Sequence, residues 1–136
     1  MMSSAQIQTH QLPSSIESLS LVEQIIEDIK NLRGIPEELY GNILVSVTEA
    51  VNNAIRHGNQ MDSSTLIEFS YEFGDKEIKF SVKDEGPGFD RSLIPDPTHP
   101  DNLEKPDGRG IFIMESLSDE VEFKDGGSLV CIKFNR

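Results

Sequence analysis

Two neighbouring segments in which apolar and polar side chains alternate constrain the fold of this chain more than any other feature. In 65–73 and again in 76–84, large apolar side chains fall on every second residue, and polar side chains fill most positions between them. A period of two predicts strands that bury one face and leave the other in water. The intervening Gly74–Asp75 favours a tight turn that joins them as an antiparallel hairpin. Such a sheet needs a second layer on its apolar face alone.

The same alternation places a carboxylate on the apolar face of the second strand. Asp84 follows Val82 at the spacing of the inward-facing residues. A carboxylate in that position is unfavourable unless it meets a hydrogen-bond donor. The segment from Asp84 to Gly88, DEGPG, is also an ordinary turn sequence. Taken alone it therefore allows a plain turn as well as a binding role.

Two long segments with apolar residues at helical spacing supply the second layer. We expect the first helix at 16–32, capped by Ser14 or Ser15. The second is expected at 36–58, and we interpret Gly58 as a left-handed C-cap that ends it.

A short helix and three further strands complete the expected order of elements. The helix is expected at 110–117, with residues 111–114 largely buried, and the strands at 6–12, 119–124 and 128–134. This order predicts an α+β fold in which all 136 residues form one domain. The architecture is a two-layer sandwich with the helices on one face of a mostly antiparallel mixed sheet.

The second half of the long helix, LVSVTEAVNNAIRHG, carries an unusual polar stripe. Glu49 and Asn53 stand at i and i+4, so both side chains project from one face, a turn apart. Two adjacent asparagines, Asn52 and Asn53, weaken a helix where this one should be strongest. The stripe is consistent with a solvated face or with a binding site.

A glycine pair near the C-terminal helix forms a third candidate site. Gly108 and Gly110 flank Arg109 just before the expected helix. They would expose backbone N–H groups at the positive end of the helix dipole, which suits a phosphate. A simple loop-to-helix junction has the same pattern. Arg109 and Lys105 could add positive charge for phosphates, and salt bridges on an acidic surface explain them equally well.

A long segment of low periodicity precedes this glycine pair. Residues 89–108 hold four of the seven prolines. Loops of this length in a compact domain are lids, binding loops or disordered segments. We expect a lid at about 89–109.

Charge and composition exclude several classes of function. A net charge of −12 argues against non-specific nucleic-acid binding, and it means that a phosphate ligand needs local positive groups. The sequence has no apolar run near the ~20 residues of a membrane span and no signal-peptide start. Cys131 is the one cysteine, and His10, His57 and His99 lack the spacing of zinc ligands. These features predict a cytoplasmic protein that binds neither membranes nor nucleic acid directly.

Three motifs occur in a fixed order: E-x-x-x-N on a helix, D-x-G-x-G after a strand, and G-x-G before a helix. Together they resemble the nucleotide-binding boxes of the histidine kinase-like ATPases, which include gyrase, the Hsp90 chaperone and MutL and share the Bergerat fold. The chain is most similar to the bacterial anti-sigma-factor serine/threonine kinases, over about Gln6 to Phe134. Its lid sequence and its length, without the flanking domains of sensor kinases or gyrases, support this resemblance.

The resemblance implies that the chain binds ATP with Mg²⁺. It gives Asn53 as a magnesium ligand and Glu49 as the base that takes the proton from the attacking hydroxyl group. It implies that Asp84 accepts a hydrogen bond from the adenine amine, that Gly88 lets the base approach the backbone, and that Ser128 helps to hold Asp84 and a water. A simple strand-start hydroxyl is the alternative for Ser128. The remaining expected pocket residues are His57, Gly86, Lys105, Gly108, Arg109 and Gly110.

The resemblance also implies a function. Such a protein phosphorylates a serine or threonine of a small antagonist protein, sequesters a sigma factor and commonly forms a homodimer. The alternative is a nucleotide-gated binding module that has no phosphotransfer activity and in which ATP changes the partner that docks.

Overall fold

A computed structural model describes residues 7–86 and 106–136 of the chain, and it describes side chains in the second range from Arg109 onward. The elements occur in the predicted order: β1 (Ile7–Pro13), α1 (Glu17–Arg33), α2 (Glu37–Asn53), the π-helical turn η1 (Ala54–Gly58), β2 (Leu66–Phe73), β3 (Glu77–Lys83), α3 (Pro106–Leu117), β4 (Glu120–Lys124), the 3₁₀ turn η4 (Asp125–Gly127) and β5 (Leu129–Asn135).

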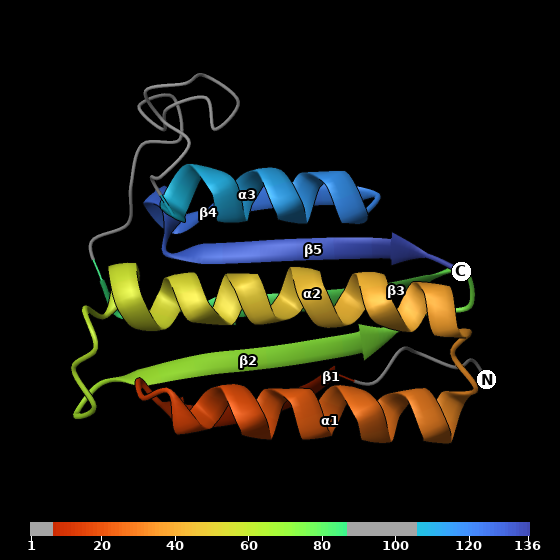
Figure 1. Cartoon of the computed structure of the whole chain (residues 1–136), viewed down its shortest axis with the longest axis horizontal. Coiled ribbons are helices and arrows are strands. Elements are labelled where there is room, and N and C mark those ends of the chain that lie inside the picture. Colours follow the sequence, from red (N-terminus) through yellow and green to blue (C-terminus); the bar gives the residue numbers. More distant parts are fainter. Residues whose placement is uncertain (1–6, 87–105) are drawn as a thin grey trace.

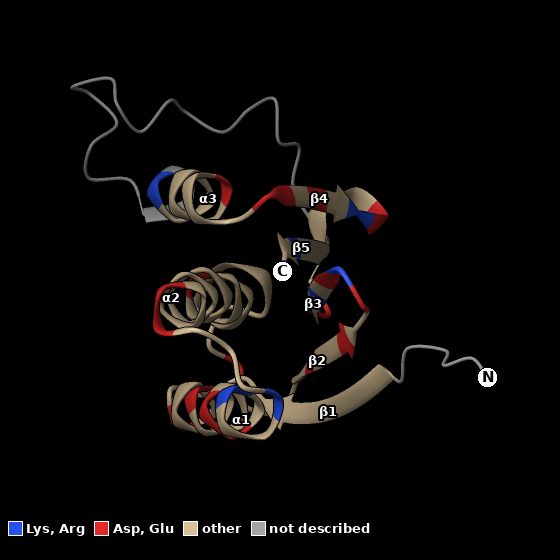
Figure 2. Cartoon of the chain, turned by 90° about the vertical axis from the view of Figure 1, so that its right-hand side faces the viewer, with Lys and Arg blue, Asp and Glu red and all other residues tan. Residues whose placement is uncertain are grey.

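The strands form one sheet, and the helices cover one of its faces. The strand order is β1-β2-β3-β5-β4, and each of these four pairings is antiparallel. Seen from the end, α1, α2 and α3 form one layer and the strands form the other (Figure 2). The predicted α+β two-layer sandwich is confirmed, and the described strands meet only antiparallel neighbours.

The core lies between the two layers and follows the predicted alternation. On β3 the inward residues Ile78, Phe80 and Val82 are all buried. The opposite face of the sheet is solvated and carries charged rows such as Glu72, Lys79, Lys133 and Glu120, which are register neighbours across four strands. Burying one large apolar side chain contributes about 1.5–3 kcal/mol, so the helical layer is attached chiefly through this apolar face.

Helix α2 runs across the middle of the helical layer, with α1 and α3 on either side (Figure 1). Its C-terminal end and the start of α3 lie at the same end of the molecule. This end is where the three sequence motifs meet. No helix within 7–86 or 106–136 combines the length and the hydropathy needed to cross a membrane.

Three local predictions were wrong. Helix α1 begins at Glu17 without a side-chain cap, because the buried Ser14 hydroxyl donates instead to the Thr65 carbonyl, at 3.1 Å. Helix α3 begins at Pro106, so the Gly108–Gly110 motif lies inside its first turns. Phe112 is 49% exposed, since α3 turns only part of its circumference to the core.

The fourth correction concerns the end of the long helix. Gly58 is not left-handed, and the helix widens into the π turn η1. The Asn59 N–H group donates to the Ala54 carbonyl five residues earlier, at 2.8 Å. This wide turn sets the position of Gly58. Gly58 contacts Asp84, the residue that directly follows β3.

Candidate functional site

Gly58 and the segment after β3 meet at very short range. A Cβ atom on Gly58 would lie 2.2 Å from Oδ2 of Asp84, and one on Gly86 would lie 2.1 Å from the Gly58 carbonyl oxygen. No side chain fits in either place, so glycine is required by this close approach. The backbones of the first and second motifs are therefore in direct contact, and the Asp84 carboxylate lies at their junction.

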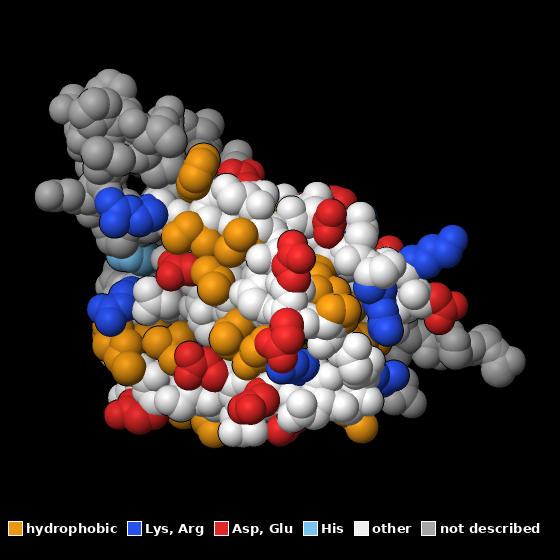
Figure 3. Space-filling model, turned by 45° about the vertical axis from the view of Figure 1, so that its right-hand side comes forward, with side chains coloured by type: hydrophobic (Ala, Val, Ile, Leu, Met, Phe, Trp, Pro, Cys, Tyr) orange, Lys and Arg blue, Asp and Glu red, His pale blue; other side chains and the backbone are white. Residues whose placement is uncertain are grey.

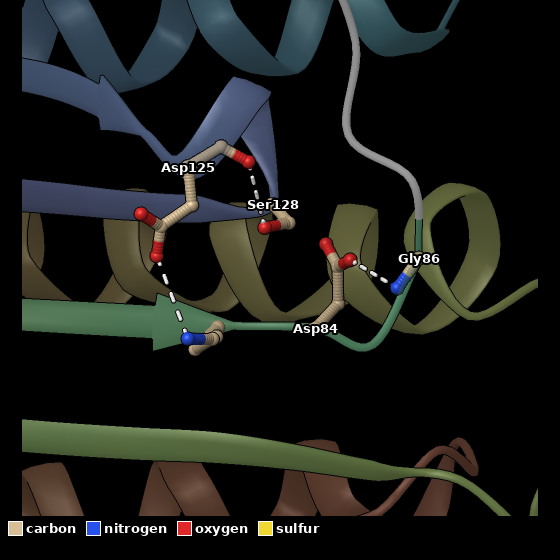
Figure 4. A network of polar contacts seen from close by, with 5 residues as sticks. Asp84, Gly86, Asp125 and Ser128 are labelled. Carbon is tan, nitrogen blue, oxygen red and sulfur yellow. Dashed lines mark hydrogen bonds and ion pairs between the residues drawn. The ribbon is translucent and has the colours of Figure 1, made fainter.

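Asp84 is held through both its backbone and its side chain. Its backbone N–H group donates to the Ser128 carbonyl at 2.9 Å. One oxygen of its carboxylate accepts from the Gly86 N–H group at 2.8 Å (Figure 4). Burial raises the pKa of the Asp84 carboxyl group above its usual range, and the bond from Gly86 partly opposes that rise. The carboxylate is half-buried and keeps acceptor capacity for a further donor, as its inward phase on β3 predicted.

Ser128 contacts Asp84 differently from the sequence expectation. Its backbone carbonyl accepts from Asp84, whereas its hydroxyl donates to the Asp125 carbonyl at 3.1 Å and so closes the β4–β5 turn (Figure 4). The side chain is buried. Ser128 therefore positions Asp84 through its main chain in this structure.

The third motif meets the first at the start of α3. A Cβ atom on Gly110 would lie 2.8 Å from Nδ2 of Asn53 and 3.1 Å from Oε2 of Glu49. The i, i+4 spacing had placed Glu49 and Asn53 on one face of α2, and that face is the one that α3 approaches. Both side chains are partly buried and remain accessible beside the first turns of α3.

Two arginines and a histidine lie near this end of an acidic protein. Arg56 and His57 belong to η1 and Arg109 belongs to α3, and all three are exposed. Figure 3 shows Lys or Arg groups on either side of a His at the left-hand end of the helical face, and both acidic and basic side chains over the rest of that face. Arg56 also donates to Oδ1 of Asn52 at 2.9 Å. The two arginines carry positive charge, which a phosphate site in a protein of net charge −12 requires nearby.

Part of the predicted site lies outside the described residues. Gly88, Lys105 and nearly all of the expected lid at 89–109 belong to this part of the chain. Gly108 is described only as backbone within α3. Arg109 and His57 lie at the same end of the molecule as Glu49 and Asn53.

The described residues fit the groups of a magnesium nucleotide. The carboxylate of Asp84 beside two glycine backbones suits a flat base that carries an amine donor. The amide oxygen of Asn53 is a normal magnesium ligand, and magnesium takes most other ligands from phosphate and water. Within 7–86 and 106–136, no three His, Cys, Asp or Glu side chains gather in a way that could hold a metal ion.

Sequence reasoning missed two residues of this site. Gly58 was interpreted as a helix cap, whereas its role here is close contact with Asp84. Asn59 lies just beyond the predicted end of the second helix and was given no role, yet it is buried and accepts a hydrogen bond from the residue after Asp84. A glycine and an asparagine directly after the E-x-x-x-N helix were the available signal.

Comparisons with known proteins agree with this geometry. The chain is 30% identical over 124 residues to the serine-protein kinase RsbW of Staphylococcus epidermidis, covering 85% of this chain and 78% of that protein. It is 26% identical over 120 residues to the serine-protein kinase RsbW of Oceanobacillus iheyensis, covering 84% and 76%. These names confirm the predicted resemblance to the serine/threonine kinases, and they support the assignment to the enzyme class of protein serine kinases.

A solved structure shows the same fold. The RsbU and RsbW domains of Rv1364c from Mycobacterium tuberculosis match with a TM-score of 0.62 at 16% identity. The match covers 96% of this chain and 32% of that longer chain. The histidine kinase-like ATPase domain family matches residues 12–134. The convergence of the three motifs at one end of the sandwich and this match over nearly the whole length give one conclusion: the chain belongs to the histidine kinase-like ATPase domain family.

Proposed function

We propose that this protein is a Mg-ATP-dependent serine/threonine kinase that acts as an anti-sigma factor. It phosphorylates a small antagonist protein and sequesters a sigma factor. The observation that carries the proposal is the approach of Gly110 to Glu49 and Asn53, because it brings a carboxylate, an amide and a helix N-terminus together at one point. Its relatives named serine-protein kinase RsbW support the choice of phosphotransfer over other ATPase chemistry.

Each residue has one task in this proposal. Asp84 accepts a hydrogen bond from the adenine amine, while the close contacts of Gly58 with Asp84 and of Gly86 with Gly58 hold its carboxylate in place, and Gly88 lets the base approach the backbone. Asn53 holds Mg²⁺, which neutralises phosphate charge when bound. The N–H groups at the start of α3 face the phosphates, Arg109 adds positive charge, and His57 lies at the edge of the pocket.

Glu49 is the proposed general base. Its carboxylate takes the proton from a serine or threonine hydroxyl of the substrate protein as that oxygen forms a bond to the γ-phosphorus. The bond from the γ-phosphorus to ADP breaks in the same step, and ADP leaves with the electron pair. Glu49 is only partly buried, which leaves it within reach of a hydroxyl on another protein.

The partners follow from the same proposal. In the cytoplasm the protein binds either a sigma factor or an antagonist protein that carries the serine or threonine hydroxyl. Phosphorylation of the antagonist prevents the antagonist from binding to the kinase. We also propose a homodimer. The sheet offers a place for a second copy at either edge, because β1 and β4 each pair with one neighbour within the described sheet.

The proposal is tested by incubating the protein with radiolabelled Mg-ATP and candidate antagonist proteins from the same genome. Label on a serine or threonine of one candidate is the expected result. The Glu49→Gln variant should keep its ATP affinity and lose the transfer, since the amide cannot accept the proton. Confirmed ATP binding with no label on any candidate would favour the nucleotide-gated binding module instead.

A further inference from the structure

Asn59 is a buried side chain whose hydrogen bonds reach three other parts of the chain. It is 6% exposed. Its Nδ2 donates to Oγ of Ser14 at 2.7 Å and to the Leu66 carbonyl at 3.1 Å, and its Oδ1 accepts from the Glu85 N–H at 2.7 Å. Both amide hydrogens are therefore used, and the oxygen holds the residue directly after Asp84.

Glu85 completes a closed ring with Asn59. Its carboxylate accepts from the Leu66 N–H, while the Leu66 carbonyl accepts from Asn59. The start of β2 is thereby bound on both sides, by Asn59 from the end of α2 and by Glu85 from the end of β3. Glu85 itself is exposed, so its side chain is not needed for the core.

The backbone after Asn59 adopts a conformation that side chains disfavour. Gln60 and Met61 have φ values of 52° and 61°, in the left-handed region. Neither is a glycine, and Met61 donates its N–H to the Ile55 carbonyl at 2.7 Å. The chain therefore turns sharply after η1 through two residues in an unfavourable backbone conformation, directly after the buried Asn59.

Two contacts therefore join the same pair of segments at consecutive residues. Gly58 meets Asp84, and Asn59 meets Glu85. We propose that Asn59 is a positioning residue of the nucleotide site, which, with Glu85, clamps the 84–86 turn against Gly58 and so holds the Asp84 carboxylate ready for adenine. This inference rests on the proposed ATP site. It adds a determinant of nucleotide affinity that touches no nucleotide atom.

A purely structural role for Asn59 makes a different prediction. In that case its loss would lower the melting temperature and leave the affinity of the folded protein for ATP unchanged. Ser18 provides the matched control. Ser18 is a buried serine, four residues after Ser14 in the chain. Its hydroxyl donates to the Pro13 carbonyl at 2.6 Å, and this hydrogen bond does not involve residues 84–86.

The test is calorimetric titration of the whole chain with Mg-ATP. It compares the wild type with Asn59→Ala, Glu85→Ala, Glu85→Gln and Ser18→Ala. We expect Asn59→Ala and Glu85→Ala to raise Kd about tenfold, the effect of about 1.4 kcal/mol, because a mobile turn presents Asp84 correctly only part of the time. Glu85→Gln should stay near the wild type, since its amide oxygen still accepts from Leu66. Ser18→Ala should lower the melting temperature without changing Kd.

The outcomes separate this inference from the proposed function. Wild-type Kd in Asn59→Ala, or an equal loss of affinity in Ser18→Ala, would overturn the clamp and leave the ATP site intact. If Asn59→Ala does not fold, the comparison of Glu85→Ala with Glu85→Gln tests the clamp instead. Wild-type ATP affinity in Glu85→Ala would overturn the clamp as well. A wild-type protein that does not bind Mg-ATP would refute the proposed function, and the clamp with it.

Discussion

Replacing Gly110 with alanine should separate activity from stability. The added Cβ would lie 2.8 Å from Nδ2 of Asn53 and 3.1 Å from Oε2 of Glu49, whereas ordinary contact starts at 3.4 Å. The amide must therefore withdraw by about 0.6 Å and the carboxylate by about 0.3 Å, the differences between these distances. Both atoms are the ends of flexible side chains, so they can move with little effect on the backbone.

The stability and activity of this variant should respond in opposite directions. Gly110 lies inside α3, where alanine is favoured over glycine by about 0.5–1 kcal/mol. This gain offsets the cost of moving two side chains, so the melting temperature should be unchanged or higher. A shift of ~1 Å in a catalytic group can reduce the rate 100-fold, and displacement of both the proposed base and the proposed magnesium ligand should lower phosphotransfer by about 10- to 100-fold.

The assays are thermal unfolding and transfer of label to the substrate protein. Gly41→Ala is the matched control, since Gly41 lies inside α2 with no atom within 4 Å of the position of an added Cβ. It should gain similar stability and keep full activity. A Gly110→Ala protein with undiminished phosphotransfer would refute the placement of Glu49 and Asn53 at the reacting centre.

Three further predictions concern the pocket and the helices. Gly58→Ala should destabilise the fold and abolish measurable ATP binding in calorimetry, because its Cβ would overlap the Asp84 side chain; normal binding would contradict the proposed base pocket. Burial raises the pKa of Asp84, so the proton it retains stabilises the fold below the usual value of 3.8, and this contribution is lost as the pH rises through the higher folded-state pKa. Asp84→Asn should therefore melt at or above the wild-type temperature at pH 7, with the difference shrinking in acid, and should bind ATP more weakly; a lower melting temperature at pH 7 would contradict the burial argument. Gly34→Ala should lower stability by about 1–2 kcal/mol in denaturant unfolding, since Gly34 ends α1 with a φ of 66°, and should leave ATP affinity unchanged.

The sheet could be predicted from the sequence because its pattern is local. The alternation that ends in Val82 predicted which face of β3 is buried. The same alternation placed Asp84 on that face, although its hydrogen-bond partners could not be predicted. The i, i+4 spacing of Glu49 and Asn53 likewise needed only helix geometry. Each of these inferences depends on residues that are near one another in the chain.

Features that depend on distant contacts could not be predicted. The two glycines around Arg109 disfavour a helix interior, so α3 was expected to start at 110, although Pro106 is a typical first helical residue. Contact with Glu49 and Asn53 is what makes glycine suitable there. The bond from Asn59 to Glu85 joins residues 26 apart, and nothing in the loop sequence marks its partner.

The π turn at the end of α2 lets the chain hold one more residue before Gly58 than an ordinary turn would. The wide turn uses five residues for about the rotation that four residues make in an α-helix, so the chain beyond it keeps nearly the same direction. In an uninterrupted α-helix the same extra residue would turn Gly58 and Asn59 by about 100° around the helix axis and away from β3, from 3.6 residues per turn. The wide turn is therefore what keeps Gly58 against Asp84 while Glu49 and Asn53 face α3.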